Sequence, residues 1–396
     1  MIQISPETQL FIREHSSDDV RALALQAKKY PDIDMPTAIT QIAGRQAAAE
    51  KIPSWREIEE IWYPKHLSLE QCSSEITARY KARLLQGDSL TDLTGGFGID
   101  CSFLATGFKS ATYVERQEEL CEIAAHNFPI LNLNHINVRN EDGVAYLQSM
   151  SPVDCIFLDP ARRNEHGGKT VAISDCEPNV AELEALLLSK ANRVMIKLSP
   201  MLDLSLALKE LKHTQEVHIL SVNNECKELL ILLGQTSPAE IAIHCVNLLT
   251  KGTQEEQHFV FTREQEQRSQ CTYTDSLGDY LYEPNASLLK AGAFRSIATA
   301  YPVRKLHPNS HLYTSDSFIE NFPGRIFRIA NQCSLNKKEV KENLADLKKA
   351  NVTVRNFPAT VAELRKRLHL TEGGDIYLFA STLNNGQKVI IRCEKV

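Results

Sequence analysis

Two stretches of the sequence carry the residues best suited to chemistry. In the first, an apolar segment ends in Asp92 and runs into a turn that contains Gly95, Gly96 and Gly98. In the second, an apolar segment ends in Asp-Pro-Ala-Arg-Arg, which begins at Asp159. Glycine lets the backbone approach a ligand that a Cβ would repel, and a carboxylate that ends an apolar strand is costly unless it has a polar task. The pattern therefore predicts a ligand site where these strands end.

Two further acidic residues follow predicted strands. Glu115 comes 19 residues after Gly96, and an acid there can accept both hydroxyls of a ribose. Asp142 could accept a hydrogen bond from an adenine amino group, or could only cap the helix after it. This set favours a nucleotide-like cofactor, either NAD or S-adenosylmethionine. The NAD fingerprint would place a small residue where Cys101 stands, and it would not need Asp92.

The Asp-Pro-Ala-Arg-Arg segment predicts how a substrate could be held. The fourth strand of an open α/β sheet delivers its last residues into the crevice where ligands bind. Pro160 fixes the backbone there, so that neighbouring carbonyl groups can point at a substrate, and Arg162 and Arg163 could bind phosphate. The alternative is that Asp159 only caps the next segment and that both arginines are surface residues.

The elements that must position these residues change in type along the chain. Residues 1–85 show helical periodicity, and from about residue 88 strands alternate with helices, which indicates a parallel sheet covered on both faces. The short link at residues 223–227, between the strands predicted at 216–222 and 228–233, favours an antiparallel pair at one edge of the sheet. The predicted strands are 89–93, 110–114, 136–139, 153–158, 193–198, 216–222 and 228–233.

The remainder of the chain predicts smaller α+β modules. Strands are expected at 240–249 and 258–261, a loop at 262–272 and a helix at 286–298. From residue 321 the order is strand, helix, strand, helix and two strands. Asn384, Asn385 and Gly386 form the turn between those two strands, because Asn and Gly tolerate positive φ.

Composition excludes several classes of protein. With 396 residues, 43% hydrophobic and 24% charged, the chain is expected to fold into two or three soluble domains. It has no run of 18 apolar residues and no signal peptide, so we expect a cytoplasmic protein without a membrane segment. Its ten cysteines form no Cys-x-x-Cys pair and are expected to be reduced thiols.

The net charge of −6 is unevenly distributed. Residues 321–396 contain 14 Lys and Arg against 7 Asp and Glu. A basic module on an acidic body suggests a polyanionic partner, although a solvated helix face is an equal alternative. The residues that could follow an RNA backbone are Lys337, Lys338, Lys341, Lys348, Lys349, Arg365, Lys366 and Arg367.

The histidines predict no metal site. His307 and His311 are four residues apart, but Pro308 lies between them and makes a helical pair of ligands improbable. The sequence predicts no oligomeric state.

Residues 92–98, Glu115, Asp142 and 159–163 together resemble the class I S-adenosylmethionine-dependent RNA methyltransferases. The Asp-Pro-Ala-Arg form is similar to a motif of the RNA 5-methyluridine enzymes, which need a nucleophilic Cys just after the fifth strand. Here residues 194–200 read Val-Met-Ile-Lys-Leu-Ser-Pro and contain no Cys. This departure argues against carbon methylation and for a nitrogen or oxygen target.

Over nearly its full length the chain also resembles a methyltransferase family of Bacteroidetes. The resemblance is carried by residues 282–294, 306–315 and 355–358 as well as by the motifs above. It implies an α/β, Rossmann-like, seven-stranded class I methyltransferase domain, preceded by a helical N-terminal region and followed by small ferredoxin-like and THUMP-like domains. The expected boundaries are 1–85 for the helical region, 86–237 for the methyltransferase domain, 238–320 for the connecting and ferredoxin-like region, and 321–396 for the basic THUMP-like domain.

The resemblance assigns roles to the candidate residues. The expected function is methylation of a nitrogen of an RNA base, in rRNA or tRNA, with S-adenosylmethionine as cofactor. The alternatives are a methyltransferase acting on a small molecule or protein, and a non-catalytic module that binds S-adenosylmethionine or RNA. The catalytic candidates are Asp159, Pro160 and Arg162. The cofactor-binding candidates are Asp92, Thr94, Gly95, Gly96, Phe97, Gly98, Glu115, Arg116, Asp142, Gly143 and Asp159.

Overall fold

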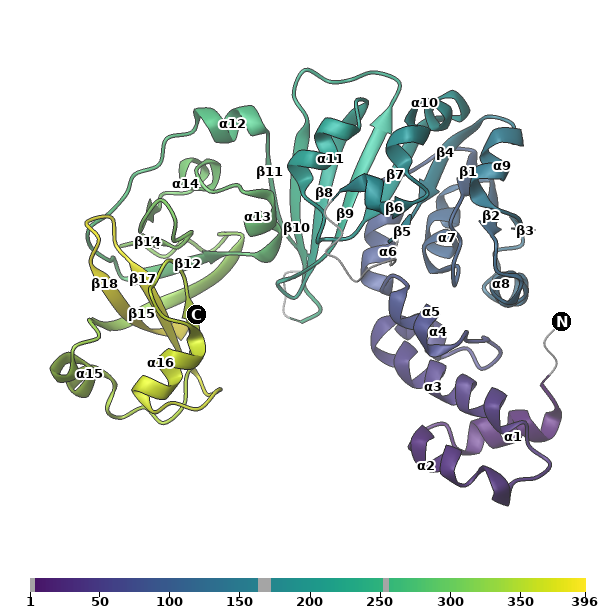
Figure 1. Ribbon diagram of the computed structural model, residues 1–396, viewed down its shortest axis with the longest axis horizontal. Coiled ribbons are helices and arrows are strands. Elements are labelled where there is room, and N and C mark those ends of the chain that lie inside the picture. The colour runs from purple at the N-terminus through teal and green to yellow at the C-terminus, as the bar shows by residue number, and fades with distance from the viewer. Residues whose placement is uncertain (1–3, 163–171, 252–255) are drawn as a thin grey trace. The chain divides into compact units, whose positions relative to one another are not determined.

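The computed structural model describes residues 4–162, 172–251 and 256–396 (Figure 1). The chain divides into two compact units. Unit 1 consists of Met1–Gln215 and Leu229–Pro238, and unit 2 consists of Glu216–Glu228 and Ala239–Val396. Each unit has its own apolar core, so the two are described in turn.

Unit 1 begins with the predicted helical region. Its helices are α1 (Pro6–Glu14), α2 (Val20–Leu25), η1 (Ala27–Lys29), α3 (Met35–Lys51), α4 (Pro53–Arg56), α5 (His66–Gln71) and α6 (Glu75–Ala82). Ser5, Asp19 and Asp34 start α1, α2 and α3 by accepting hydrogen bonds from free backbone amides. None of the helices in the described parts of the chain, of which α3 with 17 residues is the longest, is long and apolar enough to cross a membrane.

The predicted alternation of strands and helices follows. The strands are β1 (Ser89–Asp92), β2 (Ser110–Glu115), β3 (Ile136–Asn140), β4 (Val153–Leu158), β7 (Ala191–Leu198), β8 (Thr214–Val222) and β9 (Glu225–Gly234), with the short pair β5 (Ala161–Arg162) and β6 (Cys176–Glu177). The helices between them are α7 (Ile99–Leu104), η2 (Ala105–Gly107), α8 (Glu118–Ile130), α9 (Gly143–Ser149), η3 (Ile173–Asp175), α10 (Val180–Lys190) and α11 (Leu204–Glu210). All seven strands that the sequence predicts for this sheet are present.

The sheet has the order β11-β10-β8-β9-β7-β4-β1-β2-β3. The central strands β2, β1, β4 and β7 run parallel, and β9 is antiparallel to β7. The carboxyl ends of β1, β2 and β4 therefore lie at the same edge, which brings Asp92, Glu115 and Asp159 toward one another. Most residues of β4 and β7 are buried and apolar, as expected for strands covered on both faces, and Lys197 is a buried charged residue on β7.

In unit 2 the structure differs from the prediction both in the first sheet and in the loop that follows it. The strands β10 (Ala242–Leu248) and β11 (Glu256–Phe261) extend the sheet, because β10 pairs in parallel with β8 and β11 pairs with β10. The β8–β9 pair is therefore internal, and the prediction that it forms an edge was wrong. The loop predicted at 262–272 contains α12 (Arg263–Arg268), which starts at a capping box of Thr262 and Gln265.

Unit 2 also holds a second sheet of order β13-β14-β12-β15-β18-β17-β16. The strands are β12 (Tyr280–Pro284), β13 (Arg304–Lys305), β14 (Tyr313–Ser315), β15 (Gly324–Cys333), β16 (Asn351–Val354), β17 (Ile376–Thr382) and β18 (Lys388–Lys395). The helices are α13 (Ala286–Ala291), α14 (Ser296–Ala300), α15 (Lys337–Leu344) and α16 (Val361–Leu368). The single helix predicted at 286–298 is two helices, because Gly292 ends α13 with a φ of +78°.

Candidate active site

The turn after β1 needs glycine at three positions. A Cβ on Gly95 would stand 2.2 Å from the ring of Tyr113, so no larger residue fits there. Gly96 and Gly98 have φ values of +56° and +87°, and Gly98 is the N-cap of α7. A Cβ on Gly96 would meet nothing nearer than the carbonyl oxygen of Thr94 at 3.8 Å. The backbone at Gly96 therefore faces space that a ligand can enter.

Glu115, at the end of β2, holds this turn in place. The side chain is 9% exposed; its Oε2 accepts a hydrogen bond from the Gly96 amide at 2.9 Å, and its Oε1 accepts one from the Gln117 amide at 2.8 Å. Each carboxylate oxygen has a second lone pair, so Glu115 can still accept hydrogen bonds from a ligand that lies against Gly96.

Asp92, at the end of β1, is a buried carboxylate with one oxygen unsatisfied. It is 1% exposed, and its Oδ1 accepts a hydrogen bond from the Thr94 amide at 3.0 Å. Its Oδ2 has no hydrogen-bond partner among the described residues. Burial raises the pKa of Asp92 well above its usual range, and the carboxylates of Asp100, Asp159 and Glu115 add to the rise. A cationic or hydroxyl-bearing ligand would supply what this oxygen lacks.

Asp159 follows β4 and is tied to two neighbours. Its backbone amide donates to Thr94 Oγ1 at 2.6 Å, which joins the ends of β1 and β4. Its Oδ2 accepts a hydrogen bond from Lys197 on β7. Burial raises the pKa of Asp159, and the charge of Lys197 opposes that rise. The side chain keeps 35% of its surface exposed, so Asp159 can reach a substrate while Lys197 holds it.

Lys197 belongs to a buried network of charges that the sequence analysis missed. Asp100 on α7 lies 3.0 Å from Lys81 Nζ on α6 and 3.7 Å from Lys197 Nζ. Ser73 Oγ donates to Asp100 Oδ2 at 2.7 Å and accepts from Lys81 Nζ at 2.9 Å. Burial would raise the pKa of Asp100, but Lys81 and Lys197 together hold it below its usual value. The one signal in the sequence is a lysine inside an apolar strand, at Lys197.

Three other predicted cofactor residues have structural roles in the protein as it stands. Asp142 is exposed, and its Oδ1 caps α9 by accepting from the amides of Val144 and Ala145, each at 3.0 Å. A Cβ on Gly143 would stand 2.2 Å from the Leu93 carbonyl oxygen, so this glycine permits close packing. Phe97 is 3% exposed and packs edge-on against Trp55, with the ring centroids 5.3 Å apart. The ring of Phe97 thus lies in the core with the helical region.

Of the three predicted arginines, the structure describes the side chain of Arg116 alone. Arg116 is exposed, and its Nη1 lies 3.3 Å from Glu177 Oε1. Arg162 ends β5, where only its backbone is described, and Arg163 lies outside the described residues. Pro160 is buried directly after Asp159. The structure thus brings together Asp92, Thr94, Gly95, Gly96, Glu115 and Asp159, and it adds Lys197, Asp100 and Lys81 to them.

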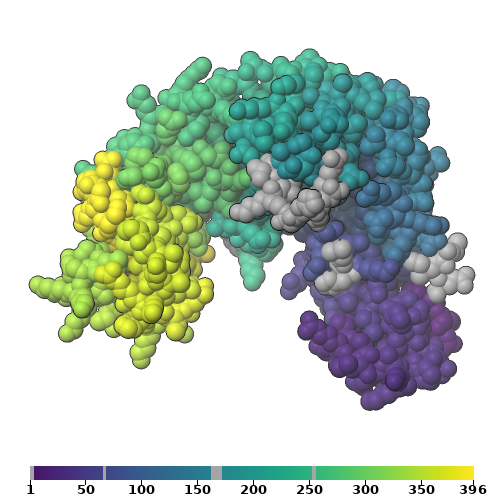
Figure 2. Space-filling model, viewed as in Figure 1, coloured from purple at the N-terminus to yellow at the C-terminus, as the bar shows by residue number. Residues whose placement is uncertain are grey.

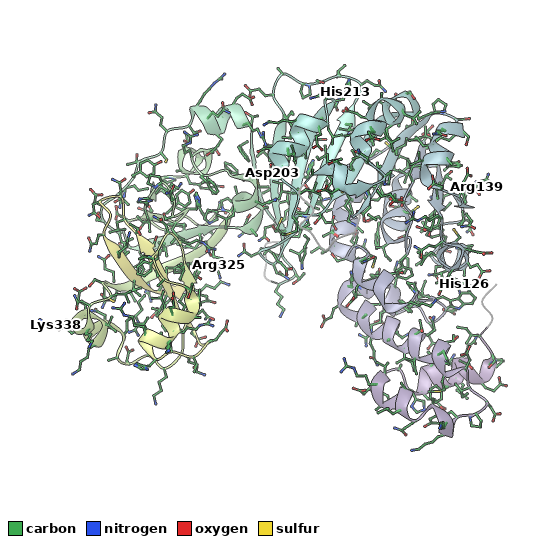
Figure 3. The ribbon with its side chains drawn as sticks, in the orientation of Figure 1. His126, Arg139, Asp203, His213, Arg325 and Lys338 are labelled. Atoms are coloured by element: carbon green, nitrogen blue, oxygen red, sulfur yellow. The ribbon has the colours of Figure 1, made fainter. Side chains whose placement is uncertain are left out.

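The predicted basic residues lie in unit 2 on α15, on α16 and in the segment after α15. Both helices pack on one face of the second sheet, where Leu344 of α15 and Leu364 of α16 share a core with Leu378 and Ile390. Lys338 points outward from α15 in Figure 3. All eight predicted residues are exposed except Arg365, which pairs with Glu372 at 3.1 Å. Residues 324–396 form the yellow-green to yellow surface in Figure 2.

The parallel strands, with their glycine turn and strand-end acids, define a class I methyltransferase fold. In the sequence this fold precedes the basic α+β tail. A ferredoxin-like domain family matches residues 280–323, and a THUMP domain-like family matches residues 324–395. A crystal structure from Porphyromonas gingivalis W83, described as a "putative methyltransferase", is 34% identical at a TM-score of 0.87, with 100% of both chains covered. The chain belongs to the family of that protein, class I methyltransferases with ferredoxin-like and THUMP-like C-terminal domains.

Other solved structures match only part of the chain. An rRNA methylase from Streptococcus thermophilus is 14% identical over 41% of this chain and 95% of its own, with a TM-score of 0.30. SMU.1697c from Streptococcus mutans, whose structure contains SAH, is 12% identical over 40% of this chain and 96% of its own, also at 0.30. No curated protein matches the sequence.

The unsatisfied carboxylate of Asp92 leads to a prediction about stability. When the pKa of a carboxyl group is higher in the folded than in the unfolded protein, the free energy of unfolding decreases as pH increases above the unfolded pKa, which is about 3.9 for Asp. Asp92→Asn should therefore raise the urea midpoint at pH 7, and the gain should shrink below pH 4. Asp88→Asn, at an exposed carboxylate, is the control and should change little. A lower midpoint for Asp92→Asn at pH 7 would mean that the ionised carboxylate is satisfied in the folded protein.

Proposed function

We propose that the protein is an S-adenosylmethionine-dependent methyltransferase that modifies a nitrogen of an RNA base, in rRNA or tRNA. Two observations on the turn after β1 carry the cofactor assignment: the Oδ2 of Asp92 has no partner among the described residues, and the backbone of Gly96 faces open space. Asp92 suits the ammonium group of the cofactor, and Glu115 suits its ribose hydroxyls. Asp142, whose Oδ1 caps α9, would use its other oxygen toward the adenine. The bound cofactor supplies an electrophilic methyl group.

Asp159 and Pro160 support a nitrogen target. With Oδ2 held by Lys197, the Oδ1 of Asp159 can accept a hydrogen bond from an amino group and orient its lone pair. A carbon target would need a nucleophile, and Ser199 and Pro200 follow β7 where a Cys would be required. The proposed reaction therefore forms no covalent intermediate with the enzyme.

The basic C-terminal segment supports RNA as the substrate. Its exposed lysines project from helices on one face of a sheet, and the segment matches a THUMP domain-like family. We propose that residues 86–237 carry the chemistry and that residues 321–396 recruit the RNA, with 1–85 and 238–320 as the helical and connecting regions. A cytoplasmic site of action fits the ten free cysteines.

The cofactor site is tested with Gly96→Val. The added side chain enters the open space beside the backbone, so the affinity for S-adenosylmethionine measured by calorimetry should fall below detection. Gly386→Val is the matched control, because Gly386 also has positive φ (+85°) and open space around it, but lies in the β17–β18 turn. Equal losses in both variants would point to backbone strain, and unchanged affinity in Gly96→Val would exclude the proposed site.

The chemistry is tested with Asp159→Ala. Mass spectrometry of nucleosides from cells lacking the gene should show one modification lost, and RNA from those cells then serves as substrate. We expect a loss of about 100-fold or more in kcat, the scale for removal of a positioned acceptor. Asp88→Ala should keep full activity. A trapped covalent adduct with 5-fluorouridine RNA would contradict the proposed nitrogen target.

The recruiting role is tested by reversing charge. The variant Lys338→Glu, Lys341→Glu, Lys349→Glu, Lys366→Glu should weaken RNA binding across sequences and leave cofactor affinity unchanged. The negative slope of log K against log salt should become shallower by about 0.7 for each phosphate that the variant no longer neutralises. The control reverses four exposed lysines elsewhere, Lys28, Lys29, Lys209 and Lys212. If both variants bind RNA equally well, the tail has another role, and a small-molecule or protein substrate gains support.

A further inference from the structure

Three histidines and a glutamate lie on one face of the first sheet, on its strands β8, β10 and β11. Glu216 and His218 lie two residues apart on β8, so their side chains point to the same face. His244 on β10 is the register partner of His218. His258 on β11 is paired with Val246, which lies two residues after His244 and therefore shares its face. The four side chains come from three adjacent strands.

The spacing within this cluster suits coordination of a metal ion. Glu216 Oε2 lies 3.7 Å from His218 Nε2 and 3.7 Å from His244 Nε2. The ligand atoms of the three residues all lie within 4.8 Å of one another. Tetrahedral ligands at about 2.0–2.1 Å from zinc are roughly 3.4 Å apart. The two Glu216–histidine distances exceed this spacing by about 0.3 Å, and the 4.8 Å limit exceeds it by about 1.4 Å, so rotation of the side chains would have to draw the ligand atoms together.

The imidazole rings of His218 and His244 lie face to face. Burial lowers the pKa of His244 to about 4, and His218 and His258 contribute to the decrease. The rings of His218 and His244 stack at 4.3 Å with an interplanar angle of 13°, and Nε2 of each ring lies 3.7 Å from Glu216 Oε2.

A fourth residue positions one of the ligands. His244 Nδ1 lies 3.2 Å from His258 Nε2. When Nδ1–H of His244 donates to His258, Nε2 of His244 keeps its lone pair for the metal. His218 is buried, His244 keeps 20% of its side chain exposed and His258 is exposed. An ion can therefore enter from solvent on the His258 side.

We propose that Glu216, His218 and His244 bind a zinc-class divalent metal ion, with His258 as a positioning residue. Two imidazoles and one carboxylate favour zinc, nickel or cobalt over magnesium or calcium, which prefer oxygen ligands. Three protein ligands leave a fourth position for water or for an oxygen of a bound molecule. The site is separate from the cofactor residues, none of which belongs to the cluster.

The test uses full-length protein without a polyhistidine tag, stripped with a chelator and titrated with zinc chloride by calorimetry. We expect one equivalent of zinc to bind to the wild type. His244→Gln should weaken binding at least 100-fold, and His258→Gln by about 10- to 100-fold, the range for a residue that orients a ligand. With cobalt, the wild type should show visible absorption bands that His244→Gln lacks.

His213→Gln is the matched control, since His213 Nδ1 lies 3.3 Å from Glu184 in a histidine–carboxylate pair without a second histidine. It should bind zinc like the wild type. Circular dichroism checks the folding of each variant, and Glu216→Gln replaces His244→Gln if the latter does not fold. The proposal is overturned if the wild type binds no zinc at 100 equivalents, or if His244→Gln and Glu216→Gln bind it as tightly as His213→Gln.

Discussion

The charges of Lys81, Asp100 and Lys197, together with that of half-buried Asp159, impose the strongest constraint on the methyltransferase unit. Moving a charge out of water costs several kcal/mol per ion unless a partner and hydrogen bonds compensate. Lys81 is fully buried and Lys197 is 8% exposed, yet each lies beside a carboxylate, and Ser73 bridges Lys81 and Asp100. The elements that carry these residues must therefore adopt one mutual arrangement.

This network explains why a helical region precedes the methyltransferase sheet. Ser73 lies just before α6 and Lys81 lies on α6, so the N-terminal helices contribute directly to the surroundings of Asp159. Two further contacts hold the same region against the sheet helices. Trp55 packs on Phe97 of the glycine turn, and Asn127 on α8 donates to the Trp62 carbonyl group and accepts from its amide. The helices are thus part of the site's support.

Strand register has the same organising effect in unit 2. Pairing of β8 with β10 and of β10 with β11 places His218, His244 and His258 on one face, and a shift of one residue would turn a strand's histidines to the other face. Packing of α15 and α16 on one face of the second sheet likewise puts the exposed lysines of both helices on the same side of that sheet. Buried Glu283, paired with Arg325 and with Arg355 at 3.0 Å, joins the ferredoxin-like and THUMP-like segments.

The strands of the first sheet and the main cofactor candidates could be predicted from the sequence, because their signals are local. An apolar run that ends in Asp92 and continues into glycines, or one that ends in Asp159 and Pro160, can be recognised within a few residues. The α12 helix, the break at Gly292 and the internal place of β8 and β9 depended on capping and pairing that local patterns leave open. The folded chain was needed to show that Lys197 holds Asp159, that Lys81 neutralises Asp100, and that three histidines from separate strands meet. Each of these depends on contacts between residues far apart in the chain, since pairing and burial, and not spacing, bring those side chains together.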